Sequence, residues 1–311
     1  MDAHGRPMQE SLSTRHRTSL AEFVAERLIR VSGFAAIGFV ALIFAFLLSE
    51  GLPAFAEVPL DNLFSTRWYP IEDHFGMMPL LLGSLVVTFG AALISIPIGL
   101  LTAIFIAEIA PRWLREILKP LVEIVAGIPS VVLGFFGIVL MSTLVRQTLG
   151  LPTGLTAFTG SLILGYMALP TIVSVAEDAL DAVPRSYRDA ALALGATKWQ
   201  TIWMVTVKAA RSGILTAMML GVGRAIGETM AVMMVTGNAA RMPLTLGSLF
   251  MPVRTMTATI AAEMGEVAQG STHFHVLFAI GIALFLITFL VNLVASLAIF
   301  RQTRRAARLL S

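Results

Sequence analysis

The residues with the clearest chemical potential are an arginine and a glutamate inside a long apolar run. The segment reads Gly221-Val222-Gly223-Arg224-Ala225-Ile226-Gly227-Glu228-Thr229-Met230. Arg224 and Glu228 are four residues apart, so on a helix they share one face and are predicted to pair. An arginine near the centre of a bilayer costs roughly 2.5–3.5 kcal/mol on insertion scales. Intramembrane ionisable residues usually serve function, and the alternative is an ion pair that only fixes helix packing.

The glycines of this segment have two interpretations. Gly221, Gly223 and Gly227 resemble a dinucleotide-binding fingerprint, but no strand precedes them and the third glycine comes one residue late. Small residues four apart let a second membrane helix approach closely. Gly223 and Gly227 are therefore predicted to form a packing face beside Arg224.

The sequence contains no recognisable catalytic or nucleotide-binding set. It has no cysteine, which excludes disulfides, thiolate metal sites and cysteine nucleophiles. HExxH, G-x-S-x-G and the phosphate-binding G-x-x-x-x-G-K-[ST] motif are missing. His273 and His275 point to different faces of a helix, so they are not expected to share a metal. We expect no cofactor and no enzymatic activity; an intramembrane enzyme using Glu228 or Glu123 as an acid–base group is the alternative.

A second feature is a polar segment, residues 177–212, between two apolar runs. Its centre reads Tyr187-Arg188-Asp189-Ala190-Ala191-Leu192-Ala193-Leu194-Gly195-Ala196-Thr197-Lys198-Trp199-Gln200. Such an alanine-rich, charged segment favours short helices and is unusual in so apolar a chain. We expect it to be a docking surface for a soluble partner. Glu177, Asp178 and Asp181 are expected to form a solvated helix face there. Glu123 is expected either to extend to the membrane boundary or to pair with Lys119.

The elements that hold these residues are membrane helices. Hydrophobic residues make up 57% and charged residues 13% of the chain, against about 25% charged in soluble domains. Six apolar runs are long enough to cross a bilayer. They are residues 31–48, 80–107, 121–145, 156–176, 213–237 and 274–300. The predicted class is an all-α polytopic membrane protein with six transmembrane helices.

The distribution of lysine and arginine predicts the orientation. Of the 22 such residues, 17 lie in the two terminal segments, the 112–119 loop and the polar segment, and four lie in the opposite loops. The positive-inside rule then places both termini and the polar segment in the cytoplasm. No basic–aromatic pattern indicates nucleic-acid binding.

These boundaries divide the chain into consecutive parts. Residues 1–30 are predicted to be a cytoplasmic segment, disordered over 1–18 and ending in an amphipathic surface helix. Residues 31–79 hold the first membrane helix and an outer loop, 80–300 the main membrane domain, and 301–311 a basic cytoplasmic tail. Residues 248–262 are too short and polar to span, so a re-entrant or surface helix is expected there.

The polar segment resembles the EAA loop of the type I ABC-importer permeases. The resemblance rests on Asp189-Ala190-Ala191 followed by Gly195. Asp189 replaces the family's glutamate and keeps its charge, whereas Lys208 stands where the family has a closing proline. Motifs elsewhere in the chain resemble the phosphate-specific permeases of PstC type. They are Trp68-Tyr69-Pro70, Ala126-Gly127-Ile128-Pro129-Ser130, Ala168-Leu169-Pro170-Thr171 and Gly223 to Val232.

The resemblance implies a type I ABC-importer permease fold and a place in the bacterial inner membrane. It implies four kinds of partner: a PstA-type permease subunit, two ATP-binding subunits, a periplasmic phosphate-binding protein and the lipid bilayer. Asp189, Ala190, Ala191 and Gly195 would contact the ATPase. The substrate pathway would include three residues of the apolar segment, Arg224, Glu228 and Thr229. The alternatives are a permease for sulfate, molybdate or phosphonate, a PstA-type subunit, and a sensor without transport.

Overall fold

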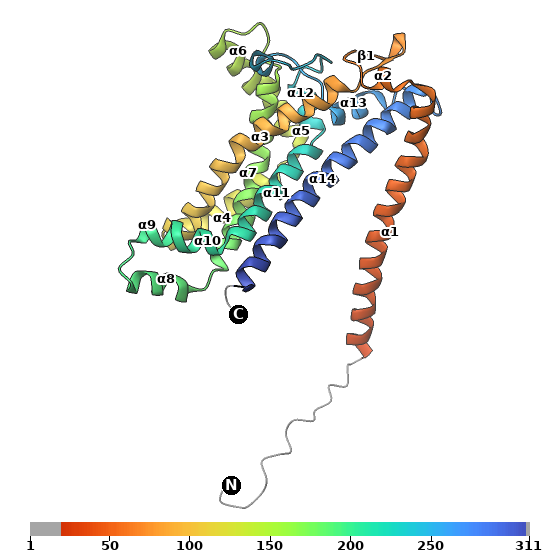
Figure 1. Cartoon of the computed structure of the whole chain (residues 1–311). Helices are drawn as coiled ribbons and strands as arrows, with labels where there is room; N and C mark the ends of the chain where they lie inside the picture. The colour runs from red at the N-terminus through yellow and green to blue at the C-terminus, as the bar shows by residue number, and fades with distance from the viewer. Residues whose placement is uncertain (1–19, 309–311) are drawn as a thin grey trace, which may run out of the picture. The chain divides into compact units, whose positions relative to one another are not determined.

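The computed structural model describes residues 20–308, and most of them are helical (Figure 1). Residues 1–18, which were expected to be disordered, and residues 309–311 of the expected basic tail lie outside this part. Within the described residues, five helices are long and apolar enough to cross a membrane, or six if one bent pair forms a single span. The all-α membrane class is therefore confirmed. The chain divides into two units, Met1–Leu47 and Leu48–Ser311.

Helix α1 (Leu20–Glu57) supplies all the described residues of the first unit. It runs without a break through residues 30 and 31, where a surface helix was expected to end and a membrane span to begin. Within the first unit, most of its large apolar side chains from Phe23 to Phe46 are exposed. Leucine and alanine favour this helix, and such an apolar surface is suited to contact with lipid or protein.

One end of the second unit is a small cluster of short elements. Helix α2 (Leu60–Leu63) leads into an antiparallel hairpin of β1 (Trp68–Tyr69) and β2 (His74–Phe75), joined by the 3-10 turn η1 (Pro70–Glu72). Trp68 and Phe75 are paired across the hairpin and buried. They join a core with residues from the beginnings of α3 and α14. We call this the hairpin end of the unit.

Four long helices form the body of the second unit (Figure 1): α3 (Met78–Ile104), α7 (Ala157–Asp181), α11 (Arg211–Gly227) and α14 (Thr272–Arg308). Glycines allow α7 to lie close to its neighbours. A Cβ on Gly99 of α3 would be 2.8 Å from Ile172, and one on Gly221 of α11 would be 2.4 Å from the same side chain. Helix α3 ends in a π-helical turn, η2 (Phe105–Ile109).

The predicted span 121–145 is divided, so this prediction is wrong in detail. Helix α4 (Arg112–Ala126) stops before Gly127–Pro129, and a new helix begins at Ser130. This helix combines α5 (Ser130–Phe136), the π-helical turn η3 (Gly137–Ser142) and α6 (Thr143–Leu149) into one span. Pro129 explains the break because proline disfavours the helical conformation of the residue before it.

The predicted span 213–237 is also divided. Helix α11 ends at Gly227, Glu228 is extended with φ −71° and ψ 131°, and α12 (Met230–Val235) then begins. Residues 248–262 form two short pieces, the 3-10 turn η5 (Leu246–Phe250) and α13 (Met256–Glu263). Met256 and three following residues of α13 are buried, and this helix lies beside α3, α12 and α14.

The polar segment forms α8 (Arg185–Ala193), α9 (Lys198–Gln200), the π-helical turn η4 (Thr201–Thr206) and α10 (Val207–Ala209). The helix Lys198–Ala209 meets Arg211–Gly227 at a bend of 72°. Helices α8 and α9 lie at the end of the unit opposite to the hairpin, where α14 also ends (Figure 1). We call this the α8 end. The polar segment and the end of α14 thus share one side, as the charge distribution predicts.

Candidate functional site

Arg224 lies where two interrupted helices meet. It is near the end of α11, and its guanidinium donates hydrogen bonds to Thr171 Oγ1 at 3.1 Å and to the carbonyl oxygen of Ala126 at 3.4 Å. Ala126 is the last residue of α4, directly before the Gly127–Pro129 break. Thr171 follows Pro170 inside α7. One side chain therefore joins α11 to both α4 and α7.

Glu228 does not pair with Arg224, so the predicted ion pair is wrong. Its carboxylate oxygen Oε1 accepts a hydrogen bond from the Ala231 amide at 3.3 Å, at the start of α12. Its carbonyl oxygen accepts one from Thr257 Oγ1 at 3.0 Å. The spacing argument assumed a continuous helix, and the chain leaves the helix at Gly227. Thr229 lies in the same break, where its hydroxyl donates to the Gly227 carbonyl at 3.3 Å.

The environment of Arg224 suits an oxyanion. Its two hydrogen bonds go to neutral oxygens, and it makes no ion pair within residues 20–308. Arginine has five N–H donors in a planar fork that matches the oxygens of phosphate or carboxylate. The helix Ser130–Leu149 also begins four residues after Ala126, and the start of a helix carries partial positive charge.

The surface beside Arg224 is open. A Cβ on Gly223 or on Gly227 would meet no atom within 4 Å, so nothing in the described part of the chain packs against the predicted face. The close glycine contacts of α11 are instead made by Gly213 and Gly221, both against α7. Arg224 is likewise exposed. The face of α11 that carries Arg224 is therefore free to border a pathway or a second subunit.

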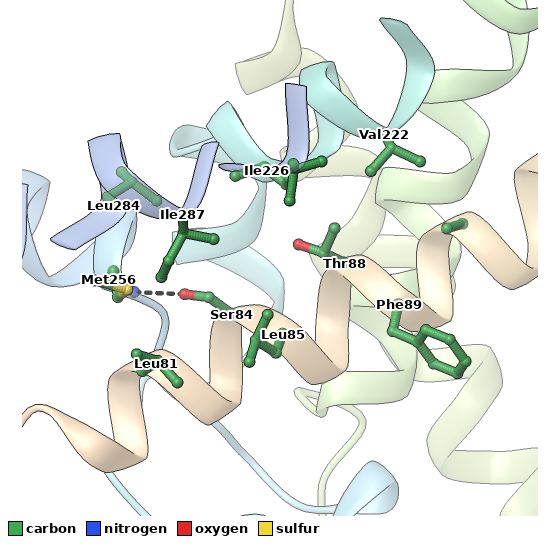
Figure 2. Close-up of a pocket in the computed structure, with 12 residues that line it drawn as sticks. Leu81, Ser84, Leu85, Thr88, Phe89, Val222, Ile226, Met256, Leu284 and Ile287 are labelled. Carbon is green, nitrogen blue, oxygen red and sulfur yellow. Dashed lines mark hydrogen bonds between the residues drawn. The ribbon is translucent and has the colours of Figure 1, made fainter. Parts of the chain in front are cut away.

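An apolar pocket lies on the other face of α11 (Figure 2). It has a volume of about 200 Å³ and lies between α3, α11 and α14. Val222 and Ile226 line it. They are four residues apart and share one face of the helix, whereas Arg224, midway between them, lies on the opposite face. Ser84 is one of its few polar groups, and its hydroxyl accepts a hydrogen bond from the Met256 amide at 2.9 Å. An oxyanion finds no charge partner there.

The residues expected to contact an ATPase lie together on one projecting segment. Asp189 and Ala190 are exposed on α8, and Ala191 is half-buried. Gly195 adopts φ +82°, a left-handed conformation that favours glycine, and so turns the chain between α8 and α9. Thr197 then caps α9 with the reciprocal hydrogen bonds of a capping box. The prediction that the polar segment favours short helices is therefore confirmed, and Gly195 separates two of them.

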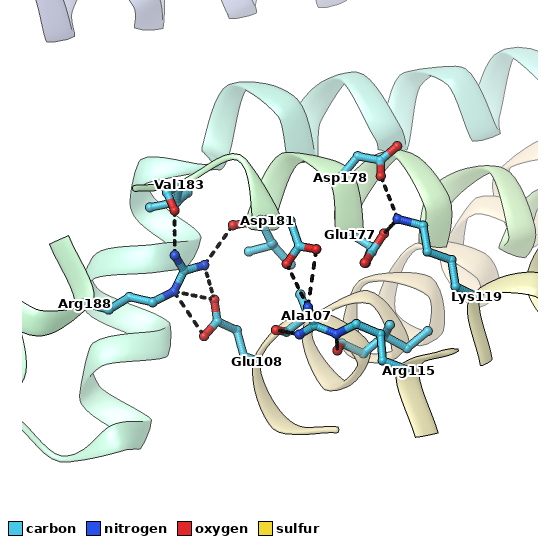
Figure 3. A network of polar contacts seen from close by, with 11 residues as sticks. Ala107, Glu108, Arg115, Lys119, Glu177, Asp178, Asp181, Val183 and Arg188 are labelled. Atoms are coloured by element: carbon cyan, nitrogen blue, oxygen red, sulfur yellow. Dashed lines mark hydrogen bonds and ion pairs between the residues drawn. The ribbon is translucent and has the colours of Figure 1, made fainter. Parts of the chain in front are cut away.

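A network of ion pairs at the α8 end was missed by sequence reasoning (Figure 3). Lys119 of α4 contacts Glu177 at 2.7 Å and Asp178 at 3.1 Å. The side chain of Glu177 is only 2% exposed, so the expected solvated face is wrong for this residue, and Lys119 pairs with it in place of Glu123. The hydrogen bond from Lys119 to Glu177 outweighs the opposing effect of burial and raises the pKa of Lys119 to about 12. Arg115 and Lys119 are four residues apart and therefore lie on one face of a helix. This spacing was the feature of the sequence that could have indicated a basic face able to pair with acidic residues of another helix.

A second network fixes the hairpin end. The carboxylate of Glu263 accepts hydrogen bonds from Trp68 Nε1 at 3.2 Å and His273 Nε2 at 2.8 Å, and it pairs with Arg254 at 2.7 Å. Burial alone raises the pKa of Glu263, but these contacts together outweigh it and leave the pKa below its usual value. His275 contacts Glu57 at 2.9 Å, so the two histidines have different partners, as their spacing predicts.

Comparison with known proteins agrees with this geometry. Residues 95–308 match the family model described as "Binding-protein-dependent transport system inner membrane component". The chain is 37% identical over 284 residues to the probable ABC transporter permease protein YqgH of Bacillus subtilis, covering 90% of this chain and 91% of that protein. It is 34% identical over 294 residues to the phosphate transport system permease protein PstC of Xylella fastidiosa, covering 87% and 89%.

Solved structures show the same fold at low sequence identity. One chain of a bacterial alginate ABC transporter aligns with a TM-score of 0.59 and 16% identity, covering 89% of this chain and 95% of that one. A chain of the MetNI methionine ABC transporter aligns with a TM-score of 0.57 and 20% identity, covering 73% and 97%. The chain therefore belongs to the binding-protein-dependent transport system inner membrane components, the non-catalytic membrane permeases of ABC importers, and is related to PstC-type permeases over most of its length.

Proposed function

We propose that this chain is the PstC-type permease subunit of an ATP-driven importer of inorganic phosphate. The similarity to phosphate permeases of several bacteria supports the substrate. The observation that carries the proposal is Arg224, a cation without an ion-pair partner in the described chain, exposed between two helix breaks. A phosphate anion supplies the charge partner that this position lacks.

Arg224 binds phosphate transiently during transfer. The anion displaces the weak hydrogen bonds to Thr171 and to the Ala126 carbonyl, and the guanidinium returns to them when the path is empty. Glu228 and Thr229 border the same break, and the Glu228 carboxylate repels the anion and keeps the site weak. A weak site suits a relay because tight capture belongs to the soluble binding protein.

The partners follow from the family. ABC importers combine permease subunits with ATPase subunits and a substrate-binding protein, and ATP is hydrolysed outside this chain. We propose a PstA-type permease as the second subunit, two ATP-binding subunits and a periplasmic phosphate-binding protein. The charge distribution supports insertion in the inner membrane with both termini and the α8 end in the cytoplasm. Asp189, Ala190, Ala191 and Gly195 then form the ATPase contact.

Arg224→Gln tests the pathway role. Removing one member of a charge-assisted contact to an anion costs about 2–5 kcal/mol, so phosphate uptake by vesicles carrying the complete transporter should fall at least about thirtyfold. Co-purification with the ATPase should be unchanged because α8 is not altered. Uptake at the wild-type rate by Arg224→Gln would contradict the proposal. Competition by sulfate, molybdate or a phosphonate stronger than by unlabelled phosphate would assign another oxyanion.

A further inference from the structure

Arg188, next to the proposed ATPase contact Asp189, is the most extensively bonded side chain of α8 (Figure 3). Its guanidinium pairs with Glu108 of η2 at 2.6 Å, and the two side chains are 19% and 9% exposed. It also donates to the carbonyl oxygens of Leu180 at 2.9 Å and Val183 at 2.6 Å. These carbonyls belong to the end of α7 and the residues after it. Arg188 thus ties α8 to the ends of α3 and α7.

Arg115 of α4 binds the same two helix ends from another side. Its guanidinium donates to the carbonyl oxygens of Ile106, at 2.9 Å, and Ala107, both in η2. It also lies 3.4 Å from the carboxylate of Asp181, the last residue of α7. Carbonyls at the end of a helix lack partners within the helix and favour cations. Arg115 and Arg188 therefore contact neighbouring residues of η2, one from α4 and one from α8.

Helix α4 extends this connection to Arg224. It runs from Arg112 to Ala126, and its last carbonyl accepts the hydrogen bond from Arg224. Lys119, in the middle of α4, holds the helix to Glu177 and Asp178 of α7. A continuous series of contacts thus runs from α8 through η2 and α4 to the proposed pathway.

A polar cavity of about 450 Å³ lies within this series. Arg115 and Arg188 line it together with Glu108, Asp181 and Asp189. Its walls come from η2, α4, α7 and α8. Ala107 of η2 and Leu180 of α7 also belong to an apolar core, whereas the contacts of α8 described above are made by a long charged side chain. Such an arrangement lets α8 move while the ion pairs hold.

We propose that Arg188 and Arg115 are positioning residues that transmit movement of α8, through Glu108 and α4, to Arg224. The inference rests on the proposed coupling role of α8 and adds the route by which that role reaches the pathway. Loss of the Arg188–Glu108 pair leaves ATP hydrolysis in place but separates it from transport. The quantity to measure is the number of phosphate ions imported per ATP hydrolysed.

The test uses the complete transporter in vesicles, with its binding protein and phosphate. Arg188→Glu or Glu108→Arg places like charges together, and each should lower the ratio of import to hydrolysis by about tenfold or more. The double exchange R188E with E108R restores opposite charges but not the hydrogen bonds to the Leu180 and Val183 carbonyls, so it should recover part of the wild-type ratio. A matched control exchanges the exposed pair Arg30 and Glu26 of α1, which should leave the ratio unchanged.

An unchanged ratio in both single variants, or a double exchange that transports no better than the single ones, overturns the proposal. Arg188→Lys covers the case in which the reversed charges prevent assembly, because it keeps the charge and loses the planar fork. It should lower the ratio about threefold or more, and a wild-type ratio in this variant also overturns the link.

A readout without phosphate separates this proposal from the substrate assignment. The chain has no cysteine, so Glu123→Cys, exposed on α4, provides one reactive thiol. A non-hydrolysable ATP analogue should change its labelling rate in the complete transporter, and Arg188→Lys should abolish that change. The same change in both proteins refutes the link through Arg188. If the thiol responds as expected but no phosphate enters the vesicles, the substrate proposal fails and the link stands.

Discussion

Thr257 offers a test of how the break at Glu228 is held. It lies in α13, is 8% exposed, and donates a hydrogen bond to the Glu228 carbonyl at 3.0 Å. Thr257→Val keeps the shape of the side chain and removes the donor. A buried carbonyl left without a partner costs about 1–3 kcal/mol. At 1.4 kcal/mol per factor of ten, the population with this break geometry falls about 5- to 150-fold.

Phosphate uptake by reconstituted vesicles measures this effect. The maximal rate should fall at least about fivefold, while the concentration of loaded binding protein that gives half the maximal rate changes little, because Thr257 is buried and not on the surface that a soluble protein can contact. Thr257→Ser keeps the hydroxyl and should retain the wild-type rate. If Thr257→Val transports as fast as wild type at equal protein, the hydrogen bond does not hold the pathway and the reasoning is refuted.

Three further predictions concern the coupling turn, the hairpin end and helix packing. Gly195→Val places a branched residue at φ +82°, which costs at least about 1–2 kcal/mol, so less ATPase should co-purify; an unchanged yield would contradict the role of the turn. The pKa of Glu263 is lower in the folded protein than in the unfolded chain, where it is near 4.3. The contacts of Glu263 therefore stabilise the fold fully above this unfolded-state pKa, and the stabilisation is lost as the pH falls through the folded-state pKa. Glu263→Gln should therefore reduce the dependence of thermal unfolding on acidic pH, and an identical pH profile would argue against it. Gly83→Ala puts a Cβ 2.2 Å from the Arg254 carbonyl oxygen and should lower stability by about 1–3 kcal/mol, whereas Gly33→Ala, where the Cβ meets nothing, should lower thermal stability far less.

Much of the fold could be predicted because each membrane helix is encoded locally. Long apolar runs and the lysine and arginine distribution were sufficient for the class and for placing residues 177–212 on the same side as the C-terminal end of the chain. The two helix breaks were harder. Pro129 signals one break directly, but Pro97 and Pro170 have the same local chemistry and lie inside continuous helices. Whether a proline ends a helix depends on neighbours that accept or supply the freed hydrogen bonds.

The site shows the same limit. The cost of a charge in an apolar run singled out Arg224 correctly as an unusual residue, but its partners lie 53 and 98 residues away along the chain. The spacing of Arg224 and Glu228 predicts a pair only on a continuous helix. Glu177 was assigned to a solvated face because its neighbours are polar, and its burial depends on α4 folding back over α7. Contacts between distant segments carry no periodic signal in one sequence.

The most direct test of the phosphate-importer assignment is ATP hydrolysis by the complete transporter reconstituted in vesicles, with phosphate supplied through the outer binding protein. The structure and the relatives predict that phosphate stimulates hydrolysis and accumulates inside, and that Arg224→Gln abolishes accumulation. Stimulation by sulfate, molybdate or a phosphonate in place of phosphate, or hydrolysis that no anion changes, would contradict the assignment.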